Sequence, residues 1–180
     1  MDAKGVTFLA RKKLIAGQFG ADKWEPFIAA LAKREPYFKT GILPTTLIPI
    51  DAFLRFNEAV LKTFYRGDER GYIAMGETTA EYSLLEGPYK TFLWNHDYQS
   101  LIEDSIPKLW KKFYSAGRVE ASYFRGGAEA LIRDLPVTHP YFDYAVVGYM
   151  KRALELGGAV DVSFRRVKDD VIHFKFKFTE

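Results

Sequence analysis

The chain contains no cysteine, and histidine is scarce, with three residues in 180. The absence of cysteine excludes disulfides, zinc thiolate centres, iron–sulfur clusters and thiol catalysis. The histidines are far apart, so the sequence has no local metal-binding pair such as His-x-x-x-His. Gly-x-Gly-x-x-Gly and Walker-type phosphate loops are missing, as is the Gly-x-Ser-x-Gly elbow of hydrolases. We therefore expect no metal centre and no enzymatic activity. An enzyme with an unfamiliar site remains an alternative.

Long apolar runs are also lacking. No stretch approaches the run of about 18 apolar residues that spans a bilayer. At the N-terminus, Arg11, Lys12 and Lys13 interrupt the apolar residues, which excludes a signal peptide. The net charge of +3 is small for this length and does not indicate a nucleic-acid partner. These features predict a protein of the cytoplasm without a transmembrane segment.

Apolar residues are abundant, at 48% of the chain, and aromatic residues make up 16%. This content supports one domain over residues 1–180, because a chain of this length buries roughly 70% of its unfolded surface. In residues 1–116 the apolar residues recur mainly every three to four positions, which predicts helices. In residues 117–180 the pattern predicts a strand, a helix and a hairpin. This order predicts an α+β fold, with an N-terminal helical part packed on a C-terminal antiparallel sheet and intervening helices.

The predicted elements follow the hydrophobic periodicity. Helices are expected at 5–18, 22–35, 52–66, 68–87, 98–116 and 141–156. Asp22, with Glu25 three residues later, forms a capping-box pattern, and Asp51 is a second candidate N-cap. Pro107 is expected to kink or break its helix.

The strands are expected at 119–123, 159–167 and 171–178, while 128–137 is ambiguous. The last two runs alternate apolar and polar residues around a short polar turn, which predicts a β-hairpin. Phe174, Phe176 and Phe178 should share its buried face with Ile172.

Several segments resemble known families. The opening "KGVTFLARKKLIAGQFGADKWEPFIAAL" is similar to the start of haem-nitric-oxide-binding domains and of a myxobacterial paralogous family of unknown function. The segments "PKLWKKFYSAGRVEASYF" and "HPYFDYAVVGYMKRALELGGAVDVSF" look closer to the myxobacterial family and to related vinyl-reductase-type ligand-binding domains. The resemblance covers nearly the whole chain and rests on patterns of glycine, tryptophan and other aromatics. It implies helices over an antiparallel sheet with a pocket between them.

The haem-binding branch of this resemblance implies a proximal histidine on a helix and a downstream Tyr-x-Ser-x-Arg motif for the haem propionates. His96, in "TFLWNHDYQSL", stands at about the right point for the histidine. The downstream motif is missing, because "SYFRGG" places Tyr123 and Arg125 too close together without a serine between them. We therefore expect a domain without haem or another cofactor, in which His96 is an ordinary helix-entry histidine. The alternative is a haem or tetrapyrrole gas sensor that uses His96.

Two further groups of residues are candidate sites. Aromatic side chains could line an apolar pocket with hydroxyl groups as polar handles, although such residues are more often core. These candidates are Trp94, Trp110, Tyr114, Tyr123, Tyr144 and Tyr149. Basic side chains of the hairpin could meet an acidic partner, although a solvated strand face is the more common meaning. These candidates are Arg165, Arg166, Lys168, Lys175 and Lys177.

The sequence therefore predicts a non-enzymatic sensor or protein-interaction domain of bacterial signalling. Its expected partner is another protein or a second copy of the chain, and its expected ligand is a small apolar molecule.

Overall fold

A computed structural model of the chain describes residues 1–39, 41–93, 97–168 and 171–180, without the side chain of Lys168. The α-helices are α1 (Gly5–Phe19), α2 (Trp24–Ala32), α3 (Ile50–Phe64), α4 (Gly71–Glu81), α5 (Ile106–Phe113) and α6 (Pro140–Leu156). Short 3-10 turns lie at Ala21–Lys23, Pro36–Lys39 and Lys90–Leu93, and π-helical segments at Tyr82–Glu86 and Ser100–Ser105. No helix in these ranges is long and apolar enough to span a membrane.

The strands form two sheets. They are β1 (Asp2–Lys4), β2 (Leu47–Pro49), β3 (Arg118–Phe124), β4 (Gly127–Arg133), β5 (Val160–Lys168) and β6 (Ile172–Thr179). β1 and β2 pair with each other, and the larger antiparallel sheet has the order β3-β4-β6-β5. β5 and β6 form the predicted C-terminal hairpin, and β6 lies between β4 and β5.

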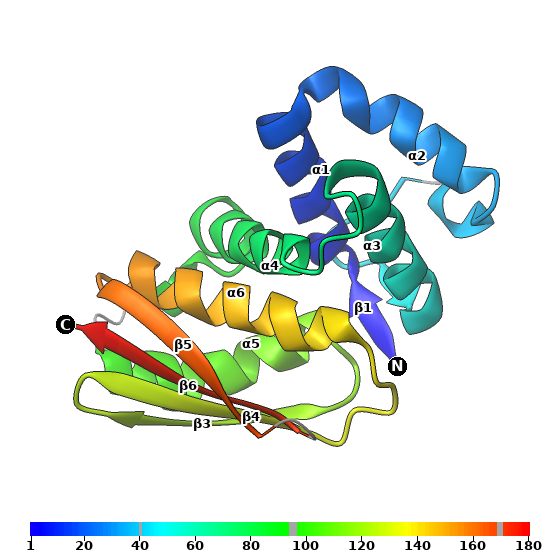
Figure 1. Cartoon of the computed structure of the whole chain (residues 1–180). Coiled ribbons are helices and arrows are strands. Elements are labelled where there is room, and N and C mark those ends of the chain that lie inside the picture. Colours follow the sequence, from blue (N-terminus) through cyan, green and yellow to red (C-terminus); the bar gives the residue numbers. More distant parts are fainter. Residues whose placement is uncertain (40, 94–96, 169–170) are drawn as a thin grey trace.

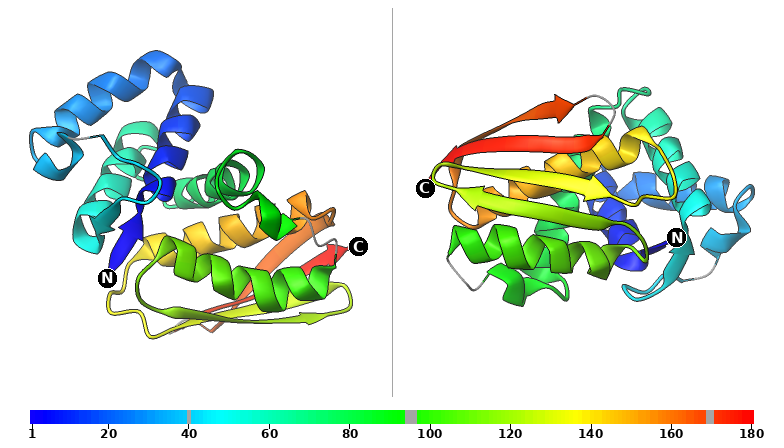
Figure 2. Two further views of the ribbon diagram at one scale, coloured as in Figure 1. Left: turned by 180° about the vertical axis from the view of Figure 1, so that it is seen from behind. Right: turned by 90° about the horizontal axis from the view of Figure 1, so that it is seen from below.

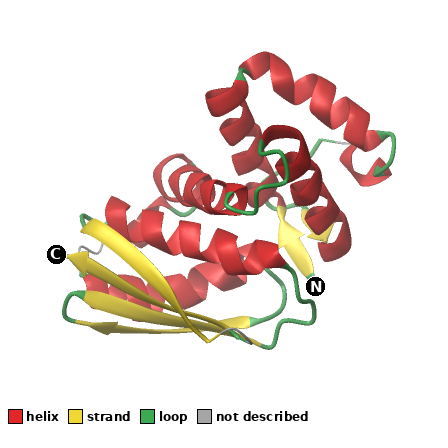
Figure 3. Ribbon diagram, in the orientation of Figure 1, coloured by secondary structure: helices red, strands yellow, loops and turns green. Residues whose placement is uncertain are grey.

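Helices and sheet form layers. Figure 1 shows α5 and α6 lying across one face of the four-stranded sheet, with α4 on the far side of α6 and α1 to α3 gathered near β1. Figure 3 shows the same division, with helices above the strands of this sheet. Seen from below, in Figure 2, the opposite face of the sheet carries no helix from the described part of the chain. The α+β prediction is confirmed.

Close contact between α4 and α6 brings the two layers of helices together. A Cβ atom on Gly76 of α4 would lie 2.0 Å from the carbonyl oxygen of Ala145, and one on Gly148 of α6 would lie 2.1 Å from that of Ile73. Since no side chain larger than hydrogen fits at these two points, the backbones of the helices touch. The core between α6 and the sheet contains the buried phenylalanines of β6, at 174, 176 and 178, as predicted, whereas Ile172, predicted to be buried with them, is half-buried.

Two predicted helix caps are wrong. The Asp22 carboxylate accepts a hydrogen bond from Lys23 Nζ at 2.7 Å, and α2 begins at Trp24 without a side-chain cap. Asp51 lies in the first turn of α3, which begins one residue earlier at Ile50. The N–H of Ile50 donates to the carbonyl of Met1, so the pairing of β1 with β2 decides where α3 starts.

The ambiguous segment at 128–137 contains a strand that the sequence did not reveal. β4 occupies the interior of the sheet, and its inward residues Ala128, Ala130 and Ile132 are buried. Alanine is poor in β propensity, so its alternation with Glu129 and Leu131 is a weak strand signal. The neighbours β3 and β6 supply the pairing that makes this segment a strand. Near Pro107 the helix is not interrupted as predicted: the π-helical segment ends at Ser105, α5 begins at Ile106, and only the hydrogen-bonding pattern changes.

Candidate functional site

A small cavity lies in the interior where α5 and α6 face each other. Its volume is about 50 Å³, and its wall is mainly apolar. The lining residues come from five elements and are Thr7, Gly76, Thr79, Ile106, Leu109, Trp110, Phe113, Tyr114, Val119, Tyr141, Ala145, Val146, Tyr149 and Met150. All of them are buried except Val146 and Tyr149, which are half-buried. Mainly apolar walls with a few polar groups are the usual character of a small-molecule site.

The amphipathic pattern of α5 places its aromatic residues in this wall. Trp110 and Phe113 are buried, whereas Lys108, Lys111 and Lys112 on the opposite side are exposed. Such a division turns the apolar stripe of a helix toward the core. The indole N–H of Trp110 donates to the carbonyl of Ala116 at 3.1 Å, which fixes the ring at the end of the helix.

The polar part of the wall consists of phenol groups. The hydroxyl oxygens of Tyr114 and Tyr141 lie 3.1 Å apart, within hydrogen-bonding distance. The Tyr149 hydroxyl lies 3.4 Å from Ser83 Oγ, whose own partner is the carbonyl of Ala80. The cavity therefore offers hydroxyl groups at two places on an otherwise apolar wall.

Behind these phenols lies a fully buried arginine, Arg11 of α1. Its Nη2 donates to the Tyr141 hydroxyl at 2.9 Å, and its Nη1 donates to the Met75 carbonyl and to Thr79 Oγ1, both at 2.7 Å. Its Nε donates to Asn57 Oδ1 at 2.8 Å. One side chain thus connects α1 with α3, α4 and α6, next to the cavity.

Burial keeps the phenols of Tyr114 and Tyr149 protonated. It raises the pKa of Tyr114 well above its usual range, and the neighbouring Tyr141 raises it further. Burial likewise raises the pKa of Tyr149, although the hydrogen bond with Ser83 opposes this. At neutral pH these groups are neutral hydroxyls, so they serve as hydrogen-bond donors and acceptors and not as anionic ligands for a metal.

The structure brings together some of the aromatic residues predicted to line a pocket. Trp110, Tyr114 and Tyr149 line the cavity. Tyr123 lies on β3, where its hydroxyl donates to Glu180 Oε1 at 2.6 Å, and Tyr144 packs half-buried at the edge of the core. Neither of these two lines the cavity. Trp94 lies outside the described residues.

Neither described histidine reaches the cavity. His139 caps α6, since its Nδ1 accepts from the N–H of Tyr141 at 3.0 Å, and its Nε2 lies 3.1 Å from Glu58 Oε1. His173 is bound to Glu129 on the outer face of the sheet. His96 lies outside the described residues, and within those residues no cluster of three His, Asp or Glu side chains could hold a metal ion.

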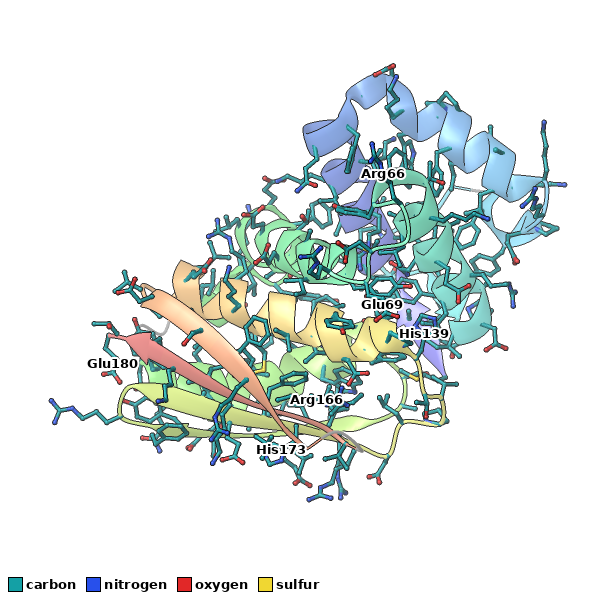
Figure 4. All side chains as sticks on the ribbon, viewed as in Figure 1. Arg66, Glu69, His139, Arg166, His173 and Glu180 are labelled. Atoms are coloured by element: carbon teal, nitrogen blue, oxygen red, sulfur yellow. The ribbon has the colours of Figure 1, made fainter. Side chains whose placement is uncertain are left out.

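The basic residues of the hairpin are divided between the two faces of the sheet. Arg165 stands opposite Lys175 in the register, and Lys177 stands opposite Ser163, so these three basic side chains share the outer face. Arg166 stands opposite Phe174 and points to the inner face, where its Nη2 lies 2.9 Å from Asp143 Oδ1 of α6. Figure 4 shows Arg166 between the hairpin and α6, and His173 on the other side of the sheet.

The backbone of Lys168 belongs to β5, and its side chain lies outside the described part. The predicted basic set therefore forms one outer group, defined here as Arg165, Lys175 and Lys177, and one inner ion pair.

Arg11 and Tyr141 were missed as site residues. Arg11 was considered only as one of three charges, with Lys12 and Lys13, that interrupt the apolar residues. Phe8, Arg11 and Ile15 are spaced by three and four residues, which puts them on one helix face. That spacing is the signal that could have placed Arg11 among buried residues.

No protein-family model and no curated protein sequence matches the chain. Solved structures do match. A mutant H-NOX domain from T. tengcongensis has a TM-score of 0.69 at 14% identity, covering 99% of this chain and 98% of that one. An unliganded Fe(II) H-NOX mutant from K. algicida has a TM-score of 0.67 at 11% identity, covering 98% and 97%.

A third structure is described as an oxygen-binding H-NOX domain related to soluble guanylate cyclases, in its oxygen complex. It has a TM-score of 0.68 at 14% identity and covers 98% of this chain and 95% of that one. The chain therefore has the fold of H-NOX domains over nearly its whole length. The resemblance to haem-nitric-oxide-binding domains is confirmed at the level of the fold, and the closer likeness to the myxobacterial family stays a prediction.

These comparisons contradict the expectation that the domain has no cofactor. One matching structure is described as probing the function of heme distortion in the H-NOX family, and another is the Fe(II) protein from K. algicida. Haem is thus the group that the fold implies, which favours the alternative prediction.

The described residues do not fit a haem as they lie. The cavity of about 50 Å³ is smaller than the roughly 300–1,000 Å³ of pockets for larger ligands. The described residues offer no histidine at the cavity wall. Haem binding would require the interior between α5 and α6 to open, with a ligand from residues outside the described ranges.

Proposed function

We propose that this chain is a gas-sensing domain of bacterial signalling, which binds a small molecule in the interior between α5 and α6 and acts on a partner protein. The observation that carries the proposal is the apolar cavity with hydroxyl groups in its wall, inside an H-NOX fold. A volume of about 50 Å³ suits a molecule of a few atoms. As a sensor, the domain has no reaction of its own to catalyse.

The proposed means of gas capture is a haem with His96 as its ligand, bound in a state in which the interior between α5 and α6 is wider than the cavity of about 50 Å³ described above. The support is the shared fold with haem-containing H-NOX domains and the position of His96 in the sequence. A bound haem would supply an iron coordination site for diatomic gases. The chain's own residues contribute an apolar surrounding, from Trp110 and Phe113, and hydrogen-bond donors, from Tyr114 and Tyr141.

The experiment measures the absorbance spectrum of the purified protein before and after addition of haemin, and then its response to nitric oxide. A Soret band that His96→Ala removes and His173→Ala retains supports haem binding through His96. His173 is a suitable control because its ring is engaged with Glu129 on the outer face of the sheet.

A cavity-filling variant tests the site itself. Ala145 lines the cavity, whereas Ala121 of β3 does not. We expect Ala145→Met to weaken the response to nitric oxide, measured by absorbance or by tryptophan fluorescence, and Ala121→Met to leave it unchanged. If wild-type protein responds without a Soret band, the gas binds the protein directly. If the wild-type protein responds to nitric oxide neither with haem nor without it, gas sensing is excluded.

The proposed partner surface is the outer group on the sheet. Lys175 Nζ lies 3.2 Å from Glu129 Oε2, whereas the described residues show no ion pair to Arg165 or Lys177. Two basic charges on an uncovered sheet face favour an acidic protein surface. Two copies of the chain would repel each other through this face, so the proposed partner is a different protein.

A further inference from the structure

Arg11 is a buried cation whose charge no carboxylate among the described residues neutralises. Its side chain is 0% exposed, and its hydrogen-bond acceptors are an amide oxygen, a carbonyl, a hydroxyl and a phenol. Arginine keeps its proton in proteins, so the guanidinium is charged here. No ion pair between Arg11 and a carboxylate occurs in the described ranges. Burial of an unpaired charge is costly, which makes this arrangement unusual for a residue with only a structural role.

The neutral partners of Arg11 form part of the cavity wall. Thr79 and Tyr141 accept its hydrogen bonds and also line the cavity. The positive charge therefore acts on the cavity across a single layer of side chains. In an apolar interior such a charge is screened much less than in water.

The hydrogen bonds among the described residues leave one hydroxyl donor of the cavity wall without an acceptor. Tyr141 accepts from Arg11, and the hydroxyls of Tyr114 and Tyr141 share a single hydrogen bond between them. Each hydroxyl has one proton. Whichever tyrosine donates, the proton of the other has no acceptor among the described residues. Both hydroxyls belong to residues of the cavity wall, so a ligand there would meet a donor that the charge of Arg11 polarises.

We propose that the cavity binds a small monoanion, of the size and chemistry of a one- or two-carbon carboxylate. An oxygen of the anion accepts from the unpaired phenol of the Tyr114–Tyr141 pair, and the guanidinium of Arg11 supplies the opposite charge. The apolar residues Trp110 and Phe113 leave room for a ligand of three or four non-hydrogen atoms. This inference goes beyond the proposed gas-sensing function, and it rests on that function only in using the same cavity as the ligand site.

The experiment compares formate with formamide, which has the same number of non-hydrogen atoms and no charge, at equal ionic strength with chloride as the control ion. Binding is measured by titration calorimetry and by the shift in Tm. We expect formate to bind about tenfold or more tightly than formamide in the wild type, because hydrogen bonds to an ionised acceptor are the stronger ones. Acetate and acetamide form a second pair.

Three variants locate the effect. Arg11→Met removes the charge while keeping an unbranched side chain, and it should abolish the preference for the anion. Arg11→Lys keeps the charge and should retain a preference for formate. Tyr114→Phe removes one hydroxyl and should weaken formate binding without unfolding the protein, so it tests the proposal even if Arg11→Met does not fold.

Equal binding of formate and formamide, or a preference that survives in both Arg11→Met and Tyr114→Phe, would overturn the inference. The proposed gas-sensing function is tested separately. If nitric oxide acts through the cavity while formate does not bind, only the anion inference fails. If Ala145→Met affects neither ligand, the cavity is not the ligand site and both ideas fail.

Discussion

Phe176 is fully buried at the centre of the four-stranded sheet, opposite Ala128 on one side and Phe164 on the other. Replacing it with alanine removes buried apolar surface and leaves a cavity. We expect Phe176→Ala to lower the free energy of unfolding by about 3–5 kcal/mol, measured by urea denaturation. Phe164, with 39% of its surface exposed, is the matched control, and Phe164→Ala should cost clearly less. Equal losses would mean that Phe176 is not more deeply buried than its cross-strand partner Phe164.

The Asp143–Arg166 pair predicts a pH-dependent stability. Burial raises the pKa of Asp143, Arg166 opposes this, and Glu69 raises it further. Asp143 Oδ1 is buried and makes no well-aligned hydrogen bond, so its contact with Arg166 is an ion pair only. When the pKa of a carboxyl group is raised in the folded state, the folded protein loses stability as the pH rises toward and through that pKa. The reason is that the folded state disfavours the ionised carboxylate.

Arg166→Met removes the opposing charge and raises that pKa further. We expect the variant to be less stable than the wild type at neutral pH, and the difference to shrink as Asp143 becomes protonated at lower pH. Thermal melts across a pH series measure this. Arg165→Met, on the outer face of the same strand, is the control and should show no such trend. A difference that is constant with pH would argue against the ion pair.

At the scale of elements, the crossing of α4 and α6 depends on two glycines. A Cβ on Gly148 would lie 2.1 Å from the Ile73 carbonyl oxygen, and backbone atoms cannot give way as a flexible side chain can. We expect Gly148→Ala to destabilise the protein by at least about 1–3 kcal/mol, because overpacking forces the helices apart. Since Tyr149 and Met150 follow directly, the cavity should change with it.

Gly17 of α1 is the matched control for this substitution. A Cβ there meets nothing within 4 Å, and the residue is exposed. Gly17→Ala should raise the free energy of unfolding by about 0.5–1 kcal/mol, because alanine loses less conformational freedom in a helix. Chemical denaturation of the two variants compares them directly. If both alanines are tolerated equally, the helices do not touch at Gly148.

At the scale of the whole molecule, the sheet presents one covered face and one uncovered face (Figure 2). The covered face contains the cavity and the Asp143–Arg166 pair, and the uncovered face contains the outer group of basic residues. A ligand that shifts α6 would therefore act on the hairpin from inside, through Arg166, while the partner binds outside. This arrangement separates the proposed ligand site from the proposed partner site by the thickness of the sheet.

The double variant Arg165→Glu, Lys177→Glu tests the partner surface. We expect it to fold normally and to associate more slowly with an acidic partner, with a weaker dependence on salt, because exposed charges act mainly by steering. A pull-down from native cell extract, followed by association kinetics, measures the effect. Lys108→Glu on the exposed side of α5 should leave binding unchanged. A partner that binds both variants and wild type equally would exclude the outer group.

Local patterns in the sequence determined the main elements. The spacing of apolar residues marked α1, α5 and α6, and strict alternation marked the hairpin with Phe174, Phe176 and Phe178 on its buried face. These features depend on neighbours a few residues apart, so the helical and strand periods reveal them directly. The strand period of two also separates Arg165 from Arg166, because adjacent residues of a strand point to opposite faces. The prediction of a single basic set overlooked this and grouped the two residues because they are neighbours in the sequence.

Only the tertiary structure decided the rest. β4 is a strand because β3 and β6 pair with it, and α3 begins where β1 meets β2. Arg11 becomes a buried charge because residues up to 130 positions away close around it, among them Asn57, Thr79 and Tyr141. The cavity likewise exists only where five separate elements meet. Hydrogen-bond partners and packed walls depend on contacts between distant segments, and no local period in the sequence encodes those contacts.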